Sequence, residues 1–436
     1  VIYYSISLLW KVFGKHEWIY RLINFIISIC GMLALLKMFE RITKDTFWSI
    51  FAVSILFTSG IYVYYSLNFL MNTTALNFVL MGWYFFFRYR DGRHSIYLYL
   101  TFALFLFGGL LKMSSFISFL SLCAVFLIDF LKVWPERTND RIISNRLSFV
   151  ISATTVIVII VLWISYVINY NKSGNSTVFL VGILPIWDLN YSEIAKNLEN
   201  IRHIWLDHYF YRPLHYYFLI GFLISVLYFK HIRKDILFLT LFISMGFIGF
   251  IVLFFNPLGQ HDYYVIDLLI LAIFIMLSLF SLLRNRELTI SLLNIPIFRV
   301  LAILLVVLSV SHTSKHIKKR FTGWHNSRHL TGFYGYASIE PYLDSIGITR
   351  SDKVLSYNDP TINVTLYLMN RHGWTKYGTN MNDSLSIVQR INMGAEYLLY
   401  HHEIDTLKGS FWKHMVEYDV GKYKNVTISK ISLPDE

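Results

Sequence analysis

The chain has 436 residues, of which 55% are hydrophobic and only 15% are charged, and its formal net charge is +12. This composition excludes an ordinary soluble protein, because most of the chain must lie in lipid. The basic residues follow the ends of hydrophobic stretches rather than one soluble face, so anionic lipid headgroups, and not nucleic acid, account for the positive charge.

Ten hydrophobic stretches have about the length needed to cross a hydrocarbon core of roughly 30 Å. Only helices and closed barrels satisfy their backbone in lipid, and these stretches are too continuous for barrel strands. The sequence therefore predicts about ten transmembrane helices. They are expected at residues 20–39, 47–65, 73–88, 96–111, 116–133, 147–169, 214–229, 236–255, 263–283 and 299–311.

The first thirteen residues form an apolar segment that is too short for a comfortable span. We expect it to be a short interfacial or re-entrant helix on the outer side, or the remnant of a span. Because the chain begins with Val1, we also expect that the natural N-terminus lies further upstream.

Lys and Arg are concentrated in every second gap between the predicted spans, and the positive-inside bias places these gaps in the cytoplasm. The basic gaps are residues 41–44, 88–93, 132–146, 230–234 and 284–299. The gaps expected to face outward are residues 14–18, 64–72, 108–115, 169–213 and 255–263. We therefore expect a multi-pass protein of the plasma (inner) membrane. A site for a lipid-linked or extracytoplasmic substrate is expected on the outer side.

After residue 313 the apolar runs shorten to the length of strands. A basic linker is expected at residues 315–328, although its lysines mildly favour the cytoplasmic side. The predicted elements that follow are a strand at 352–357, a helix at 361–370, a strand at 395–400 and a hairpin at 415–431 around Gly421. We therefore predict an all-α polytopic membrane protein with a small C-terminal α/β soluble domain. The boundaries are 1–313 for the membrane domain and 314–436 for an extracytoplasmic (periplasmic) domain.

Ionisable residues at a membrane boundary are energetically costly, so each is a candidate for function. Lys112 lies in the outer gap GGLLKMSS, where a lone ammonium suits a lipid phosphate. The alternative is that its side chain only extends to the headgroups. Glu17 and Arg21 are one helical turn apart, which predicts either a structural ion pair or a role of Arg21 in binding an anion.

A second group of candidates is polar and aromatic. His261 and Asp262 offer acid/base or metal chemistry, and Tyr263 and Tyr264 beside them suit stacking on a sugar. The alternative is an ordinary interfacial belt of aromatic residues, to which Tyr3 and Tyr4 also belong. The simplest interpretation of Asn72 is that its side-chain oxygen caps the next helix.

The outer gap at residues 169–213 is the longest, and loops of this length are more often functional than idle. Its ionisable candidates are Arg202, His203, His208 and Arg212, with Asp188 and Asp207 as weaker ones. Arg and His in a large outer loop leave an O-antigen polymerase or ligase-like enzyme open as an alternative. A non-enzymatic transporter of a lipid-linked substrate is a further alternative, although the chain lacks the internal repeat of secondary transporters. No nucleotide-binding, zinc-protease or Ser-nucleophile motif is present.

Four of the outer segments form an ordered pattern. The first contains Tyr3, Tyr4, Phe13, Gly14, Glu17 and Arg21; the second is YVYYSLNFLMNTT with Asn72; the third is GGLLKMSS; and the fourth is QHDYYVIDLL. In this order, over roughly residues 1–311, they resemble GT-C glycosyltransferases of the protein mannosyltransferase and aminoarabinose transferase-like group. That family usually has a Pro-Asp pair where this chain has Met71 and Asn72, so an acidic group is replaced here.

The resemblance implies inverting transfer of a sugar from a polyprenyl-phosphate donor to a glycan, lipid or protein acceptor on the outer face, often with a divalent metal such as Mg or Mn. It implies donor-phosphate binding by Lys112 and Arg21. The residues it assigns to substrate binding are Tyr3, Tyr4, Glu17, Asn72, His261, Asp262, Tyr263 and Tyr264. The family's catalytic acidic residue, a general base on the acceptor hydroxyl, is expected upstream of Val1, while basic groups neutralise the leaving phosphate.

Overall fold

The computed structural model describes residues 2–68, 70–132, 142–173, 179–284, 295–322, 333–401 and 411–433. The chain divides into two compact units. The first, here called the membrane unit, comprises Val1–Ser165 and Gly182–Lys318, and the second, the C-terminal unit, comprises Tyr166–Val181 and Lys319–Glu436.

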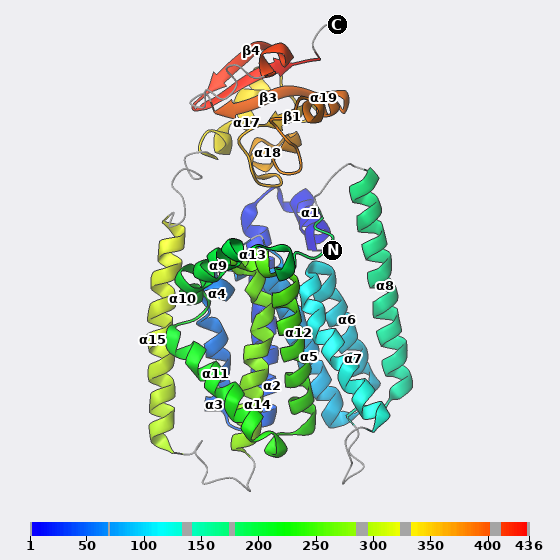
Figure 1. Ribbon diagram of the computed structural model, residues 1–436, viewed down its shortest axis with the longest axis vertical. Coiled ribbons are helices and arrows are strands. Elements are labelled where there is room, and N and C mark those ends of the chain that lie inside the picture. Colours follow the sequence, from blue (N-terminus) through cyan, green and yellow to red (C-terminus); the bar gives the residue numbers. More distant parts are fainter. Residues whose placement is uncertain are drawn as a thin grey trace. The chain divides into compact units, whose positions relative to one another are not determined.

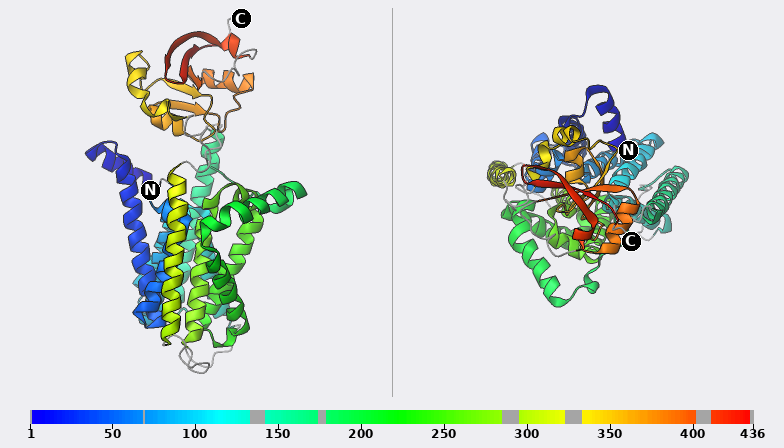
Figure 2. Two further views of the ribbon diagram at one scale, coloured as in Figure 1. Left: turned by 90° about the vertical axis from the view of Figure 1, so that its left-hand side faces the viewer. Right: turned by 90° about the horizontal axis from the view of Figure 1, so that it is seen from above.

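The membrane unit is helical, and its long helices run side by side (Figures 1 and 2). Each predicted span falls on a helix or on a bent pair of helices, and the short N-terminal segment is a helix as expected. The first eight helices with their connecting 3-10 turn are α1 (Ile2–Phe13), α2 (Glu17–Thr43), α3 (Thr46–Phe57), α4 (Gly60–Ser66), α5 (Asn72–Gly92), α6 (Ser95–Leu111), η1 (Met113–Ser115), α7 (Phe116–Leu131) and α8 (Arg146–Ser173). The later elements are η2 (Ile186–Asp188), α9 (Tyr191–Asn200), the π-helix η3 (Ile201–Trp205), α10 (Leu206–Tyr209), α11 (Arg212–Leu227), η4 (Phe229–His231), α12 (Lys234–Leu253), α13 (Phe255–Gln260), η5 (Asp262–Leu268), α14 (Leu269–Leu283) and α15 (Pro296–Phe321).

Within the described ranges, six helices are long and apolar enough to cross a membrane, or eight if each of two bent pairs is one span. The predicted spans at 73–88 and 96–111 lie on α5 and α6, and α6 is apolar but only 17 residues long. Helices α4, α9, α10 and α13 gather at one end of the bundle (Figure 1). This end carries the gaps predicted to face outward, and we call it the predicted outer end.

The predicted span at 47–65 is not one helix, which corrects the sequence interpretation. Its two parts, α3 and α4, meet at an angle of 76°. The break follows from Ser59, whose hydroxyl accepts a hydrogen bond from the Tyr62 amide and so starts a new helix. Gly60 then packs so closely on the His208 carbonyl oxygen that an added Cβ would lie 2.8 Å from it. A second bend of 96°, before α11, was also not predicted.

The last predicted span, 299–311, is too short, because α15 continues to Phe321. The first part of the expected basic linker is therefore helical, and residues 323–328 of it lie outside the described ranges. Lys, Arg and His at 315–320 are tolerated in a helix, and no Gly or Pro interrupts the segment.

A buried polar network joins α2, α4 and α5. Asn77 accepts a hydrogen bond from the Tyr62 hydroxyl (2.9 Å) and donates to Ser28 Oγ (3.1 Å). One turn earlier, the Thr74 hydroxyl donates to Asn24 Oδ1 (2.7 Å). Because unsatisfied polar groups are very costly in lipid, this network fixes how the three helices pack.

The C-terminal unit contains a five-stranded sheet in the order β2-β1-β3-β5-β4. The strands are β1 (Lys353–Ser356), β2 (His372–Thr375), β3 (Ala395–His401), β4 (Val416–Tyr423) and β5 (Val426–Ile431), with β1 parallel to β2 and β3 and the other neighbouring pairs antiparallel. The helices are η8 (Tyr336–Ser338), α17 (Glu340–Ser345), α18 (Val364–Met369), α19 (Ser384–Asn392) and α20 (Trp412–Met415). Two apolar clusters, around Leu343 and Leu355, form its core.

The predicted α/β class of this unit is confirmed, but β2 and α19 were not predicted. The expected hairpin is present with its turn in the wrong place. Tyr423 pairs with Val426, so the turn contains Lys424, whose φ of 51° is left-handed. Gly421 lies inside β4 instead, where its missing side chain leaves room for the Tyr342 hydroxyl.

Gly31 on α2 tests the importance of the polar network. An added Cβ would overlap the side chain of Asn77, so Gly31→Ala should lower the free energy of unfolding by about 1–3 kcal/mol. The matched control is Gly249→Ala on α12, where a Cβ meets nothing within 4 Å and the better helix propensity of Ala should leave stability equal or higher. Thermal unfolding in detergent would measure both, and equal stability of the two variants would contradict the role of the network.

Candidate functional site

Lys112 follows α6 at the predicted outer end and is half-buried. Its Nζ atom lies 4.3 Å from the centroid of the Tyr264 ring, a cation–π distance. Among the described residues, no carboxylate is within ion-pair distance of this nitrogen. Burial lowers the pKa of Lys112, and the nearby charge of Asp267 partly opposes this shift.

Asp267 is a site residue that the sequence interpretation missed. It is 3% exposed, and its two oxygens accept hydrogen bonds from the hydroxyls of Ser114 (2.6 Å) and Ser115 (2.9 Å). These serines form the 3-10 turn η1 directly after Lys112. A carboxylate inside the apolar run VIDLL was the available signal in the sequence, because such a group needs a partner in the protein.

Asp262 joins η5 to the α4 helix. It is 4% exposed, and its Oδ1 accepts a hydrogen bond from the Tyr65 hydroxyl (2.9 Å). The Tyr65 ring also contacts Tyr263 edge to face, with 5.9 Å between centroids.

Asn72 is buried and does not cap a helix, which corrects the simplest interpretation of its sequence position. It is the first residue of α5, whose N-cap is Met71 without a side-chain cap. Its Nδ2 donates instead to the Tyr263 carbonyl oxygen (3.0 Å). A tertiary partner has therefore replaced the local one.

Three rings are stacked next to Lys112. The centroids of His261 and Tyr263 are 5.1 Å apart and those of Tyr263 and Tyr264 are 4.8 Å apart, with interplanar angles of 23° and 28°. Burial lowers the pKa of His261, Asp262 opposes the shift, and the charge of Lys112 adds to it. The ring is therefore neutral near pH 7. We call Lys112, His261, Asp262, Tyr263, Tyr264 and Asp267 the Lys112 cluster.

Arg21 is held by Glu17 and by the loop before α5. Glu17 and Arg21 form the i,i+4 ion pair that their spacing predicted, at 3.6 Å, and Nη1 of Arg21 donates to the Leu67 carbonyl (3.3 Å). In the same loop, the Asn68 carbonyl accepts a hydrogen bond from Asn24 (2.7 Å). Helix α2 therefore holds the segment that leads to α5 and the Lys112 cluster.

The two N-terminal tyrosines are less closely connected. The Tyr3 ring contacts Tyr20 of α2 at 6.0 Å between centroids, whereas Tyr4 is 80% exposed. Of all the residues predicted for the site, the structure thus brings together Lys112, Asn72, His261, Asp262, Tyr263 and Tyr264.

The ionisable residues of the long outer loop do not join this group. Arg202 and His203 are exposed on η3, and Arg212 forms an ion pair with Asp207 (2.9 Å). His208 is buried against His316 of α15, at 4.7 Å between ring centroids. The weaker candidate Asp188 lies in the short turn η2.

The carboxylates of the cluster do not fit the divalent metal that the resemblance implies. Both oxygens of Asp267 already hold serine hydroxyls, and Asp262 holds Tyr65. Over the described ranges, no group of three His, Cys, Asp or Glu side chains is arranged to hold a metal ion.

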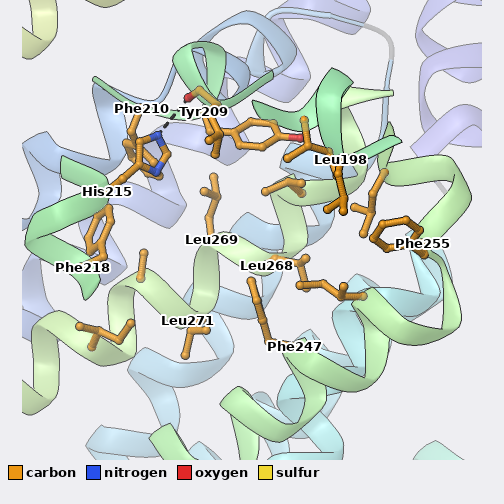
Figure 3. Close-up of a pocket in the computed structure, with 17 residues that line it drawn as sticks. Leu198, Tyr209, Phe210, His215, Phe218, Phe247, Phe255, Leu268, Leu269 and Leu271 are labelled. Atoms are coloured by element: carbon orange, nitrogen blue, oxygen red, sulfur yellow. Dashed lines mark hydrogen bonds between the residues drawn. The ribbon is translucent and has the colours of Figure 1, made fainter. Parts of the chain in front are cut away.

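An apolar pocket of about 420 Å³ is lined in part by η5 (Figure 3). Its lining comes from α9 to α14 and includes Leu198, Tyr209, Phe210, His215, Phe218, Phe247, Phe255, Leu268, Leu269 and Leu271. His215 is the most polar of these, and its Nε2 lies 3.0 Å from the Leu206 carbonyl oxygen. Val265 and Leu268 of η5 line the pocket, while Tyr264, directly before Val265, contacts Lys112.

Residues 1–166 match the family model described as dolichyl-phosphate-mannose-protein mannosyltransferase. Over these residues the chain is similar to the GT-C membrane glycosyltransferases. The matched part of the chain contains Arg21, Asn72 and Lys112, and it ends before η5. No curated protein matches the chain.

The hydrogen bond between Tyr65 and Asp262 provides a test of this geometry. Tyr65→Phe removes a hydroxyl that a buried carboxylate uses, so the free energy of unfolding of the protein should fall by about 1–3 kcal/mol. Tyr4→Phe on the exposed face of α1 is the control and should change stability little. Both can be measured as thermal unfolding in detergent, and an unchanged midpoint for Tyr65→Phe would show that this bond is not important.

Proposed function

We propose that this glycosyltransferase transfers a sugar from a polyprenyl-phosphate donor to a glycan, lipid or protein acceptor, and that the Lys112 cluster binds the donor. The observation that carries the proposal is the half-buried Lys112 ammonium, which contacts an aromatic ring and has no carboxylate at ion-pair distance among the described residues. Such a cation favours an anionic ligand, because phosphate would replace the solvation that burial has removed.

The reaction leaves negative charge on the phosphate when its bond to the sugar breaks. An ammonium fixed at this position stabilises that charge more strongly than bulk water does. The neutral His261 ring and its stacked neighbours Tyr263 and Tyr264 offer flat apolar surface for the sugar. We assign no general base among the described residues, since Asp262 and Asp267 use their oxygens to hold α4 and η1.

The apolar pocket is our candidate for the first part of the donor's polyprenyl chain. Residues of η5 contribute to both the pocket and the Lys112 cluster, so one short helix borders an apolar and a polar environment. A lipid phosphate has the same two parts joined by one bond. Burial of apolar chain surface would supply affinity at roughly 25 cal/mol per Å².

We further propose that the protein lies in the plasma (inner) membrane with its C-terminal domain extracytoplasmic. The support is the alternation of basic gaps along the chain and the position of the Lys112 cluster on the gaps expected to face outward.

Lys112→Ala tests the phosphate contact. Turnover on a polyprenyl-phosphate sugar should fall about 10²- to 10³-fold, because a charge-stabilising group in the transition state is lost. Lys112→Arg should retain part of the activity, since the charge remains. Lys234→Ala, an exposed lysine at the start of α12, is the control and should have normal turnover. Normal turnover of Lys112→Ala would refute the proposal.

A larger side chain in the pocket tests the polyprenyl contact. Ala272 lines the pocket, so Ala272→Phe should raise KM for a long polyprenyl-phosphate donor by about tenfold, or ~1.4 kcal/mol, and change KM for a short-chain donor much less. Ala103→Phe on the exposed face of α6 is the matched control. An equal change for long and short donors would place the chain elsewhere.

A further inference from the structure

Asp267 holds the turn from which Lys112 projects. Lys112 has an extended backbone with φ −149° and ψ 114° between α6 and η1. Its amide donates to the Gly108 carbonyl (2.9 Å), and its carbonyl accepts from the Ser115 amide (3.0 Å). The hydroxyls of Ser114 and Ser115 both bind Asp267, so one buried carboxylate fixes the segment that sets the direction of the Lys112 side chain.

The carboxylate of Asp267 is an unusual group to find buried in a candidate membrane span. Asp267 is nearly inaccessible to solvent and lies at the start of a span of 22 residues. Two hydroxyl donors can satisfy its oxygens, but a neutral Asn could also be held by two serines. A carboxylate differs from that amide mainly by its charge, and a negative charge at this position favours the ammonium form of Lys112.

The charge of a nearby carboxylate affects whether the buried Lys112 amine is protonated. Burial favours the neutral amine, which cannot bind phosphate as a cation, and a nearby carboxylate favours the ammonium. Direct contact would be unsuitable, because an ion pair would occupy the ammonium that the donor needs. In the described structure the carboxylate is bound to the serines instead and acts on Lys112 from beyond ion-pair distance.

We propose that Asp267 is a positioning residue for Lys112: its carboxylate holds the η1 turn through Ser114 and Ser115 and favours the charged form of the Lys112 ammonium without occupying it. The inference rests on the proposed function, in which Lys112 binds the donor phosphate. It adds the residue that makes this lysine available over the working range of pH.

Asp267→Asn removes the charge while retaining groups that can bond to both serine hydroxyls. Without the opposite charge the Lys112 ammonium loses its proton at lower pH, so the basic limb of the kcat/KM profile should move down by about one pH unit. At the pH where the wild type is still fully active, turnover should fall about tenfold. The full-length protein in detergent, with a polyprenyl-phosphate sugar, is the system to use.

Two controls separate charge from structure. In a Lys112→Arg background, Asp267→Asn should leave the basic limb in place, because Arg keeps its proton throughout this range. Ser114→Ala removes one hydrogen bond but no charge, so it should lower the unfolding midpoint without moving the limb. If Asp267→Asn lowers activity equally at every pH in both backgrounds, Asp267 has only a structural role and the proposal is wrong.

A measurement without donor distinguishes this inference from the proposed function. Acetylation of Lys112 by an amine reagent, followed by mass spectrometry across pH, reports deprotonation of the amine directly. Asp267→Asn should move its midpoint down, and an unmoved midpoint would overturn the inference whatever Lys112 binds. If the midpoint moves but Lys112→Ala leaves turnover normal, the phosphate contact is wrong instead.

Should Asp267→Asn not fold, Asp267→Glu can be used in its place. This variant keeps the charge and should keep the wild-type midpoint of acetylation, and a lowered midpoint would overturn the inference.

Discussion

Polar groups inside a membrane bundle must be satisfied by the protein itself, and the network around Asn77 is where this constraint has the widest effect. Asn77 connects Tyr62 of α4 with Ser28 of α2, and Gly31 leaves room for the contact. The Asn24 side chain extends the same arrangement to the loop before α5. The position of α4 and of this loop, and with them part of the site, therefore depends on hydrogen bonds made deep in the bundle.

The same constraint organises the site through η5. Its two buried carboxylates hold different segments, since Asp262 binds Tyr65 of α4 and Asp267 binds the turn after Lys112. The polar side of η5 thus contacts residues that are distant in sequence. Ser114 is 153 residues before Asp267, and Tyr65 is 197 residues before Asp262. Both carboxylates thus have partners in the protein, and within the described ranges neither forms an ion pair with Lys112.

Much of this could be predicted from the sequence, because hydrophobicity and charge alternate in a way that lipid enforces. The helices and the candidates Lys112 and His261 to Tyr264 followed from that pattern. The bend before α4 could not be predicted, because the sequence does not distinguish Ser59, which starts a new helix, from other small polar residues in an apolar run. Asp267 was missed for a similar reason: its importance appears only when Ser114, 153 residues earlier in the chain, is seen beside it.

The residue at position 72 affects how the elements of the site are held together. The amide of Asn72 donates to the Tyr263 carbonyl oxygen, and a carboxylate in the same place could not donate this bond. Where the resembling family has an acidic residue, this chain has a neutral group that fastens α5 to η5. The carboxylate that acts on Lys112 then comes from Asp267 on η5. The site thus presents its cation from the turn after α6 and the opposite charge from η5, and the hydrogen bonds from Ser114 and Ser115 to Asp267 hold the two segments together.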